Sequence, residues 1–253
     1  MCLCLFAINQ HDEFPFILLA NRDEFRNRPS EKAGFWEDHP QVLAGRDLQQ
    51  MGTWLGVNKS GKIAFLTNYR DPKYFNRTGP SRGALVAEFL KEEHESRSYL
   101  KSIENVNDYN GFNLVAGTVN DLHYFSNVEN KIKPIKAGIH GLSNAFLNTS
   151  WPKVNEGKSQ LLAALKSNNL ENRELFSILR DDHITDSSQL PNTGVGEELE
   201  KMLSPRFINS VEYGTVCSTV IKVNRRGVIH FEERSFDFDG QEVGHVKFHI
   251  KTN

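Results

Sequence analysis

The chain has 253 residues, of which 38% are hydrophobic and 25% charged, and its formal net charge is -2 at pH 7. This composition is typical of a soluble globular protein, and the small net charge gives no electrostatic basis for a nucleic-acid or anionic-lipid partner. No apolar run approaches the roughly 18 residues that a membrane-spanning helix needs. We therefore expect no nucleic-acid partner and no transmembrane segment, and the function has to be inferred from a site.

The beginning of the chain does not have the pattern of a secretory signal peptide. No lysine or arginine precedes its apolar stretch, and the polar residues 9–13 interrupt that stretch. The three cysteines are an odd number and do not suggest a disulfide framework. We expect a mature sequence in a reducing, cytoplasmic compartment, with an organelle matrix as the alternative.

The first half of the chain predicts two hairpins followed by helices. Residues 2–8 and 14–20 are apolar almost throughout, which is typical of adjacent antiparallel strands buried on both faces. Residues 54–58 and 62–67 predict a second hairpin. Amphipathic helices are then expected in the ranges 84–90 and 98–103.

The second half returns to strands, then helices, then strands. The expected strands are 112–119, 121–125, 132–135, 217–223 and 227–236, the expected loop is 138–144, and the expected helices are 152–166, 171–179 and 197–203. This order favours an α+β layered fold over alternating βαβ units. No repeat or long linker divides the chain, so a single domain over residues 1–253 is the simpler interpretation, and helices outside stacked sheets would give four layers.

Cys2 is the strongest candidate for a catalytic residue. Methionine before a small residue is expected to be removed during biosynthesis, which would leave Cys2 with a free α-amino group beside its thiol. An α-amine titrates at about 7.7–8.0, so a useful neutral fraction is present near neutral pH to accept the thiol proton. Nucleophile and base would then belong to one residue.

The cluster Asn21-Arg22-Asp23-Glu24 supplies two further roles. Arg22 would lower the thiol pKa of Cys2, and Asp23 would orient its amine. If the first two strands pair, residue 2 lies opposite a position close to 21 or 22, because both are about ten residues from the turn. The alternative is that Cys2 and Cys4 are inert core residues and that 21–24 is a charged turn.

Seven segments in this order resemble the NRDE family, also called the transport and Golgi organisation protein two family. They are "MCLCLFA", "ANRDEFRNRP", "GTWLGVNKSGKIAFLTNYRDP", "SRG", "GFNLVAG", "GLSNAFLNTSWPK" and "YGTVCSTV". That family is similar to amino-terminal nucleophile (Ntn) hydrolases of the conjugated bile acid hydrolase and penicillin V acylase group. The resemblance implies a four-layer αββα sandwich with Cys2 at the nucleophile position.

The resemblance also assigns other residues. Arg22 and Asp23 resemble the arginine and aspartate that flank the nucleophile in those acylases, and Asn144 resembles the asparagine of the oxyanion hole. Asn68 is a second candidate donor, with a turn-forming role as the alternative. The sequence departs from the pattern at Val216, where the acylases' distal catalytic arginine would be expected.

The resemblance implies an amide or thioester acyl substrate and no required cofactor. The alternative is a non-catalytic protein that uses the same pocket to bind and traffic heme or an acyl-CoA-type lipid. The residues give no decisive sign of heme, since Cys-x-x-Cys-His is absent and His140, His245 and His249 fit a turn and a solvated strand edge. Paired Cys-x-x-Cys spacing is also absent, so no metal is expected.

Overall fold

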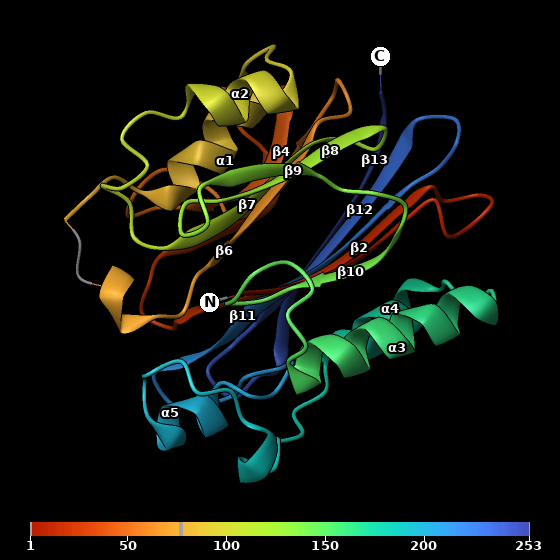
Figure 1. Cartoon of the computed structure of the whole chain (residues 1–253). Helices are drawn as coiled ribbons and strands as arrows, with labels where there is room; N and C mark the ends of the chain where they lie inside the picture. The colour runs from red at the N-terminus through yellow and green to blue at the C-terminus, as the bar shows by residue number, and fades with distance from the viewer. Residues whose placement is uncertain (1, 76–77, 253) are drawn as a thin grey trace.

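The computed structural model describes residues 2–75 and 78–252 and has four layers (Figure 1). Two antiparallel sheets face each other, and helices cover the outer face of each. The expected αββα sandwich is confirmed. No helix in the described ranges is long and apolar enough to cross a bilayer.

The first sheet carries the beginning of the chain. Its strand order is β10-β1-β2-β11-β12-β13. The bounds are β1 Cys2–Ile8, β2 Phe16–Phe25, β10 Gly138–Leu142, β11 Tyr213–Val223, β12 Val228–Phe236 and β13 Glu242–Lys251. Its outer face is covered by helices α3 (Pro152–Lys166) and α4 (Asn172–Leu179).

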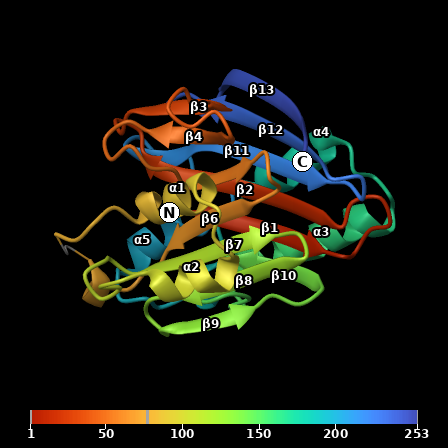
Figure 2. The same cartoon turned by 90° about the horizontal axis from the view of Figure 1, so that it is seen from above.

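The second sheet is formed mostly by the middle of the chain, in the order β3-β4-β5-β6-β7-β8-β9. The bounds are β3 Ser30–Phe35, β4 Val42–Asp47, β5 Leu55–Asn58, β6 Ile63–Asn68, β7 Phe112–Thr118, β8 Asp121–Ser126 and β9 Lys131–Pro134. Helices α1 (Arg82–Lys91) and α2 (Ser96–Ser102) cover it, α5 (Glu197–Met202) lies at the rim of the first sheet, and 3₁₀ turns span Pro72–Tyr74 and Ser187–Gln189. Viewed from above, β3 lies over β12 and β13, and β6 lies over β1 (Figure 2).

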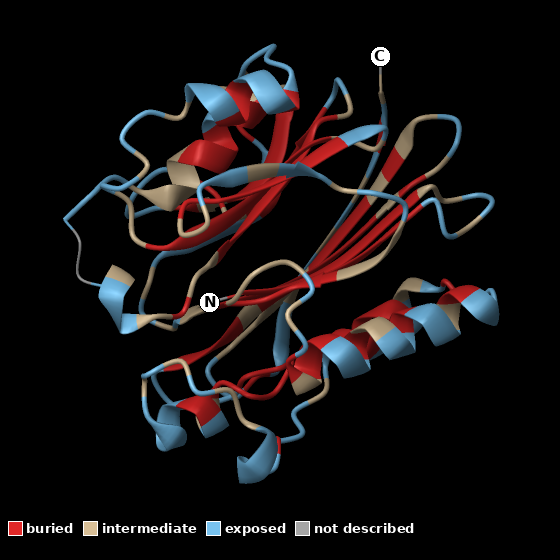
Figure 3. Cartoon of the chain, in the orientation of Figure 1, coloured by how far each residue is buried: buried red, intermediate tan, exposed pale blue. Residues whose placement is uncertain are grey.

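The side chains of β1 alternate between two apolar layers, one between the two sheets and one between the first sheet and its helices. In β1, Cys4 and Phe6 point into the layer between the sheets, whereas Leu3 and Leu5 point to the helices α3 and α4. Successive side chains of a strand face opposite sides, so a strand between two apolar layers is apolar throughout. Buried strands therefore lie at the centre of the molecule, with helices exposed on their outer sides (Figure 3).

Close contact of α3 with β1 fixes the layer beneath the beginning of the chain. Pro152 starts α3, where its missing N–H removes no intrahelical hydrogen bond. Gly157 lets the helix approach β1, because a Cβ at this position would lie 2.5 Å from Leu5 Cδ1. Strand β1 is thus held by its neighbouring strands and by helix α3.

The structure corrects three details of the predicted elements. Strand β2 continues through the charged cluster to Phe25, so residues 21–24 are not a turn. The predicted loop at 138–144 contains the edge strand β10, which pairs with β1. Strands β3 and β4 were not predicted; β3 is mostly exposed and lacks an apolar pattern, whereas β4 is short and almost wholly buried.

Candidate active site

The pairing of β1 with β2 places Cys2 directly opposite Arg22. On its other side, Arg22 is opposite Cys217 of β11. Directly opposed residues of antiparallel strands have their side chains on the same face, so Cys2, Arg22 and Cys217 form a row facing the second sheet. The predicted proximity of residue 2 to positions 21 and 22 is confirmed.

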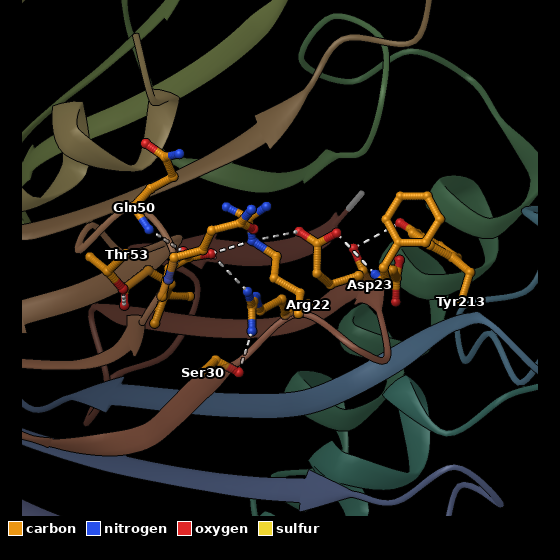
Figure 4. Close-up of polar contacts among 12 residues, drawn as sticks. Arg22, Asp23, Ser30, Gln50, Thr53 and Tyr213 are labelled. Carbon is orange, nitrogen blue, oxygen red and sulfur yellow. Dashed lines mark hydrogen bonds and ion pairs between the residues drawn. The ribbon is translucent and has the colours of Figure 1, made fainter.

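Contacts with the second sheet hold the Arg22 side chain in place (Figure 4). Its Nη1 donates to Ser30 Oγ at 2.8 Å, and Nη2 lies 3.4 Å from Asp47 Oδ2. The guanidinium carbon is 3.9 Å from the centre of the Trp54 ring, a cation–π distance. Arg22 is therefore a fixed positive charge beside Cys2, partly neutralised by Asp47.

Asp23 occupies the alternate face of β2, toward α3. Its Oδ1 accepts a 2.8 Å hydrogen bond from Thr215 Oγ1, and its main-chain oxygen accepts one of 2.7 Å from the Tyr213 hydroxyl. Burial raises the pKa of the carboxyl group, while Lys153 lowers it. Met1, whose removal is expected from the sequence, lies outside the described residues.

Lys153 is a charged residue of the site that the sequence analysis missed. Its side chain is buried at the start of α3, and its Nζ donates to the main-chain oxygen of Leu203 at 2.8 Å. Burial lowers its pKa to about 8, although the carboxylate of Asp23 acts in the opposite direction. The sole signal in the sequence is its position after Trp151-Pro152 in one of the family segments.

This lysine makes the stability of the chain dependent on pH. Lys153 has a folded pKa of about 8 against an ordinary value of 10.5, so the unfolded chain binds more protons between these values and the free energy of unfolding rises with pH there. Relative to Lys153→Met, the native chain should gain about 2 kcal/mol between about pH 7.5 and about pH 10. Denaturant unfolding at several pH values measures the difference, with Lys166→Met at the exposed end of α3 as control. A difference that does not change with pH would contradict the prediction.

The thiol pKa of Cys2 differs from the sequence expectation. Burial raises it, and this outweighs the effect of Arg22, which lowers it. Burial raises the pKa of Cys4 and Cys217 further, well above the ordinary thiol value. Among the three thiols Cys2 is the one that lines the cavity described below, whereas Cys4 packs between the two sheets.

Asn144 and Asn68 lie together next to the first strand. The Asn144 side chain donates from Nδ2 to the main-chain oxygen of Asn68 at 3.0 Å, and its own main-chain oxygen accepts from the Arg70 amide at 2.7 Å. The preceding residue, Ser143, donates from Oγ to the main-chain oxygen of Cys2 at 3.3 Å. The loop after β10 is thereby tied both to Cys2 and to the end of β6, and one amide hydrogen of Asn144 remains for another acceptor.

A cavity of about 1070 Å³ opens at this end of the sandwich. Its lining includes Cys2, Arg22, Asp23 and Asn68. One side carries apolar residues from α5 and the segments around it, namely Val195, Leu199, Met202, Leu203 and Val211. The cavity therefore combines a thiol, charged groups and an apolar wall, and it is large enough for a small organic molecule.

Comparison with known proteins decides the family. The family model described as "Transport and Golgi organisation 2" matches residues 1–237. The chain belongs to the Transport and Golgi organisation 2 family. It is 36% identical over 257 residues to the Transport and Golgi organization protein 2 homolog of Bos taurus, with 93% of each chain covered. It is also 36% identical over 258 residues to the Homo sapiens homolog, again with 93% of each covered.

The fold of this family member is similar to that of an Ntn hydrolase. The crystal structure of the C2A mutant of conjugated bile acid hydrolase from Clostridium perfringens superposes with a TM-score of 0.53. The alignment covers 100% of this chain and 98% of the hydrolase, at 10% sequence identity. This likeness shows a shared fold.

Val216 occupies an irregular position in this family member. Strand β11 changes register against β2 between Thr215 and Cys217, so Val216 is the extra residue of a bulge. The three singled-out histidines do not line the cavity: His140 stacks on Phe6, His245 lies 2.8 Å from Glu232, and His249 packs against His230. The structure thus brings Cys2, Arg22, Asp23 and Asn68 to the cavity. Asn144 is not a lining residue, but its side chain is bonded to the main chain of Asn68.

Proposed function

We propose that this member of the Transport and Golgi organisation 2 family is an amino-terminal cysteine hydrolase that acts on amide or thioester acyl groups. The observation that carries the proposal is the position of Cys2, which lies in the cavity wall, opposite the fixed guanidinium of Arg22. Asp23 is adjacent to Arg22 and held on the other face of the strand. The shared fold with a hydrolase supports the proposal.

In the proposed reaction the α-amine of Cys2 is the base. It takes the thiol proton, Sγ bonds to the substrate carbonyl carbon, and the carbonyl electron pair moves onto oxygen. The tetrahedral intermediate then collapses, and its bond to the leaving amine or thiol breaks. The leaving group receives the proton from the α-ammonium, and the acyl group remains on Cys2 as a thioester. Water then gives a proton to the α-amine and attacks the thioester, releasing the acid and restoring the thiol. Asp23 orients the amine in this scheme, and Arg22 stabilises the thiolate.

The oxyanion formed in each half of the reaction needs hydrogen-bond donors. Asn144 supplies the amide hydrogen that its bond to Asn68 leaves free, and the Asn68 side chain is a second candidate. The bond to the end of β6 limits the rotation of the Asn144 side chain. Donors fixed in this way stabilise a developing charge without reorganisation.

Mass spectrometry with acyl probes tests the proposal. We expect amide and thioester probes to form an adduct on Cys2, located by fragment ions, and none on Cys4 or Cys217, which do not line the cavity. A chain with Cys2→Ser tests whether the thiol is required. The absence of any Cys2 adduct across amide, ester and thioester probes would refute the hydrolase.

Two observations favour a carrier as the second candidate function. The resemblance places Val216 where an arginine would be expected, and burial raises the pKa of the Cys2 thiol. A non-catalytic pocket would bind heme or an acyl-CoA-type lipid saturably with no adduct. An absorbance titration with heme and a binding titration with an acyl-CoA identify this case if the affinity survives Cys2→Ser.

A further inference from the structure

Lys153 occupies a position that disfavours a positive charge. It is the second residue of α3, in the first turn, where the free main-chain N–H groups and the helix dipole repel cations. Its side chain is also buried, so the ammonium group loses the hydration that it has in water. Both effects destabilise the charged form, and this charge therefore needs an offsetting interaction inside the protein.

The titratable groups that act most strongly on Lys153 come from different sides of the site. Asp23 and Cys2 belong to the first sheet, Glu200 to α5, and Arg70 follows β6. Arg70 and Glu200 lie 3.1 Å apart, so their opposite charges largely cancel at Lys153. Burial raises the thiol pKa of Cys2, which keeps the resting thiol neutral near neutral pH. The carboxylate of Asp23 is therefore the net counter-charge of Lys153.

Asp23 depends on the charge of Lys153 in turn. Burial raises the pKa of its carboxyl group, whereas the charge of Lys153 and the hydrogen bond from Thr215 lower it. The neighbouring Glu24 acts to raise this pKa, but it lies 3.8 Å from Arg28, which balances part of its charge. A protonated amino terminus also lowers the pKa, but the neutral amine that accepts the thiol proton supplies no such charge. In that form of the site, Lys153 is the cation that keeps Asp23 ionised.

The interaction between Lys153 and Asp23 acts at a distance. The described residues show no direct hydrogen bond between the two side chains: Nζ donates to the main-chain oxygen of Leu203, and Asp23 accepts from Thr215. Charges in a buried region are screened much less than charges at the surface, so the attraction does not require contact. The cavity lining, given for the described residues, does not include Lys153. Lys153 therefore acts on a reaction in the cavity through other groups.

Resting on the proposed hydrolase function, we propose that Lys153 is a positioning residue whose charge keeps Asp23 ionised and so holds the Cys2 amine ready to accept the thiol proton. An ionised Asp23 accepts a hydrogen bond from the neutral amine and stabilises the ammonium that forms when the amine takes the proton. A protonated Asp23 would not stabilise that ammonium. Lys153 thus extends the charged groups of the site from Cys2 through Asp23 to helix α3.

The pH dependence of acylation tests this role on protein that begins at Cys2. The measurement is the second-order rate constant for Cys2 adduct formation with a thioester probe between about pH 5 and about pH 9. We expect Lys153→Met to move the acidic limb of this profile to higher pH by about one unit or more, because Asp23 and the amine then both hold their protons more tightly. Lys153→Gln, which removes the charge but keeps a donor for the Leu203 oxygen, should give a shift of the same sign. Lys166→Met, at the exposed end of α3, should leave the limb in place.

Carboxyl NMR supplies a measurement that needs no turnover. In protein labelled with ¹³C at the aspartate carboxyl carbons, the signal that is lost in Asp23→Asn identifies Asp23, and its titration gives the pKa. We expect this pKa to rise by about one unit or more in Lys153→Met and Lys153→Gln, and to stay near the native value in Lys166→Met. An Asp23 pKa that is the same in the native protein and in both Lys153 variants would overturn the proposal.

The outcomes separate this inference from the proposed function. If adducts form on Cys2 and the Lys153 variants lower the rate by the same factor at every pH, with the acidic limb in place, the hydrolase stands. Lys153 then supports only the end of α5 through Leu203, and its positioning role is refuted. If the Asp23 pKa rises in both Lys153 variants while acyl probes form no adduct on native Cys2, the hydrolase fails and the charge coupling between Lys153 and Asp23 stands.

Discussion

Protein that retains Met1 is expected to acylate Cys2 about 10²–10⁴-fold more slowly than protein that begins at Cys2. An extra residue converts the α-amine of Cys2 into an amide, which cannot accept the thiol proton, and this factor is the usual contribution of a positioned general base. Burial raises the thiol pKa, so little thiolate forms without a base, and loss of the base lowers the acylation rate by its full contribution. The two forms are prepared with and without a cleavable amino-terminal extension, and intact-mass measurement identifies each.

The measurement is the second-order rate constant for acylation by a thioester probe, with thermal unfolding of both forms as the control for folding. Rates equal within about threefold would contradict the role of the α-amine. Lys153 would then be the next base to test, because its pKa of about 8 gives it a neutral fraction near neutral pH. Combining Lys153→Met with the retained Met1 would show whether the lysine replaces the amine.

The local part of the site could be predicted from the sequence. Strands β1 and β2 are consecutive and joined by a short polar turn, so the distance of each residue from the turn sets its partner. Counting places the partner of Cys2 close to position 21 or 22, and the structure shows that it is Arg22, so that Asp23 faces the other side of the strand. The pairing of β11 with the far side of β2 does not follow in this way, because β11 begins about 190 residues later in the chain.

Strands β3 and β10 lack a strand signal in their own residues. Most of β3 is exposed and polar, and it is held by pairing with β4. The edge strand β10 contains Gly138 and Gly141, which are typical of a loop. A Cβ at Gly141 would lie 2.6 Å from Val154 of α3, so this glycine is explained by close helix packing that a single sequence does not reveal.

The burial of Lys153 near Asp23 and the position of Arg82 in the cavity wall also depend on tertiary packing. Lys153 and Arg82 both occupy the first turn of a helix, where a basic residue is ordinarily solvent-exposed. Packing of α3 against the first sheet buries Lys153, and the position of α1 over the second sheet brings Arg82 to the cavity. Neither placement can be inferred from helical periodicity.

Replacement of Asn144 is expected to slow adduct formation on Cys2 about 10²–10³-fold, the loss typical of one oxyanion donor. The rate constant with an amide or thioester probe measures the effect of Asn144→Ala. Equilibrium binding of an unreactive acyl ligand should change little, because a donor to the oxyanion acts mainly in the transition state.

Asn68→Ala is the control that distinguishes loss of the oxyanion donor from a structural change around Asn144. The Asn144 side chain contacts the main-chain oxygen of Asn68, which this substitution retains, so the Asn144 donor should stay in place. A small effect of Asn68→Ala beside a large one of Asn144→Ala would assign the oxyanion donor to Asn144. Asn144 is buried and bonded to β6, so its replacement could destabilise the fold. The rate loss is therefore attributed to the oxyanion donor only if the thermal unfolding temperature of the variant is close to that of the native protein. An unchanged rate in a folded Asn144→Ala protein would remove Asn144 from the mechanism, and an equal loss in both variants would mean that both side chains bind the oxyanion.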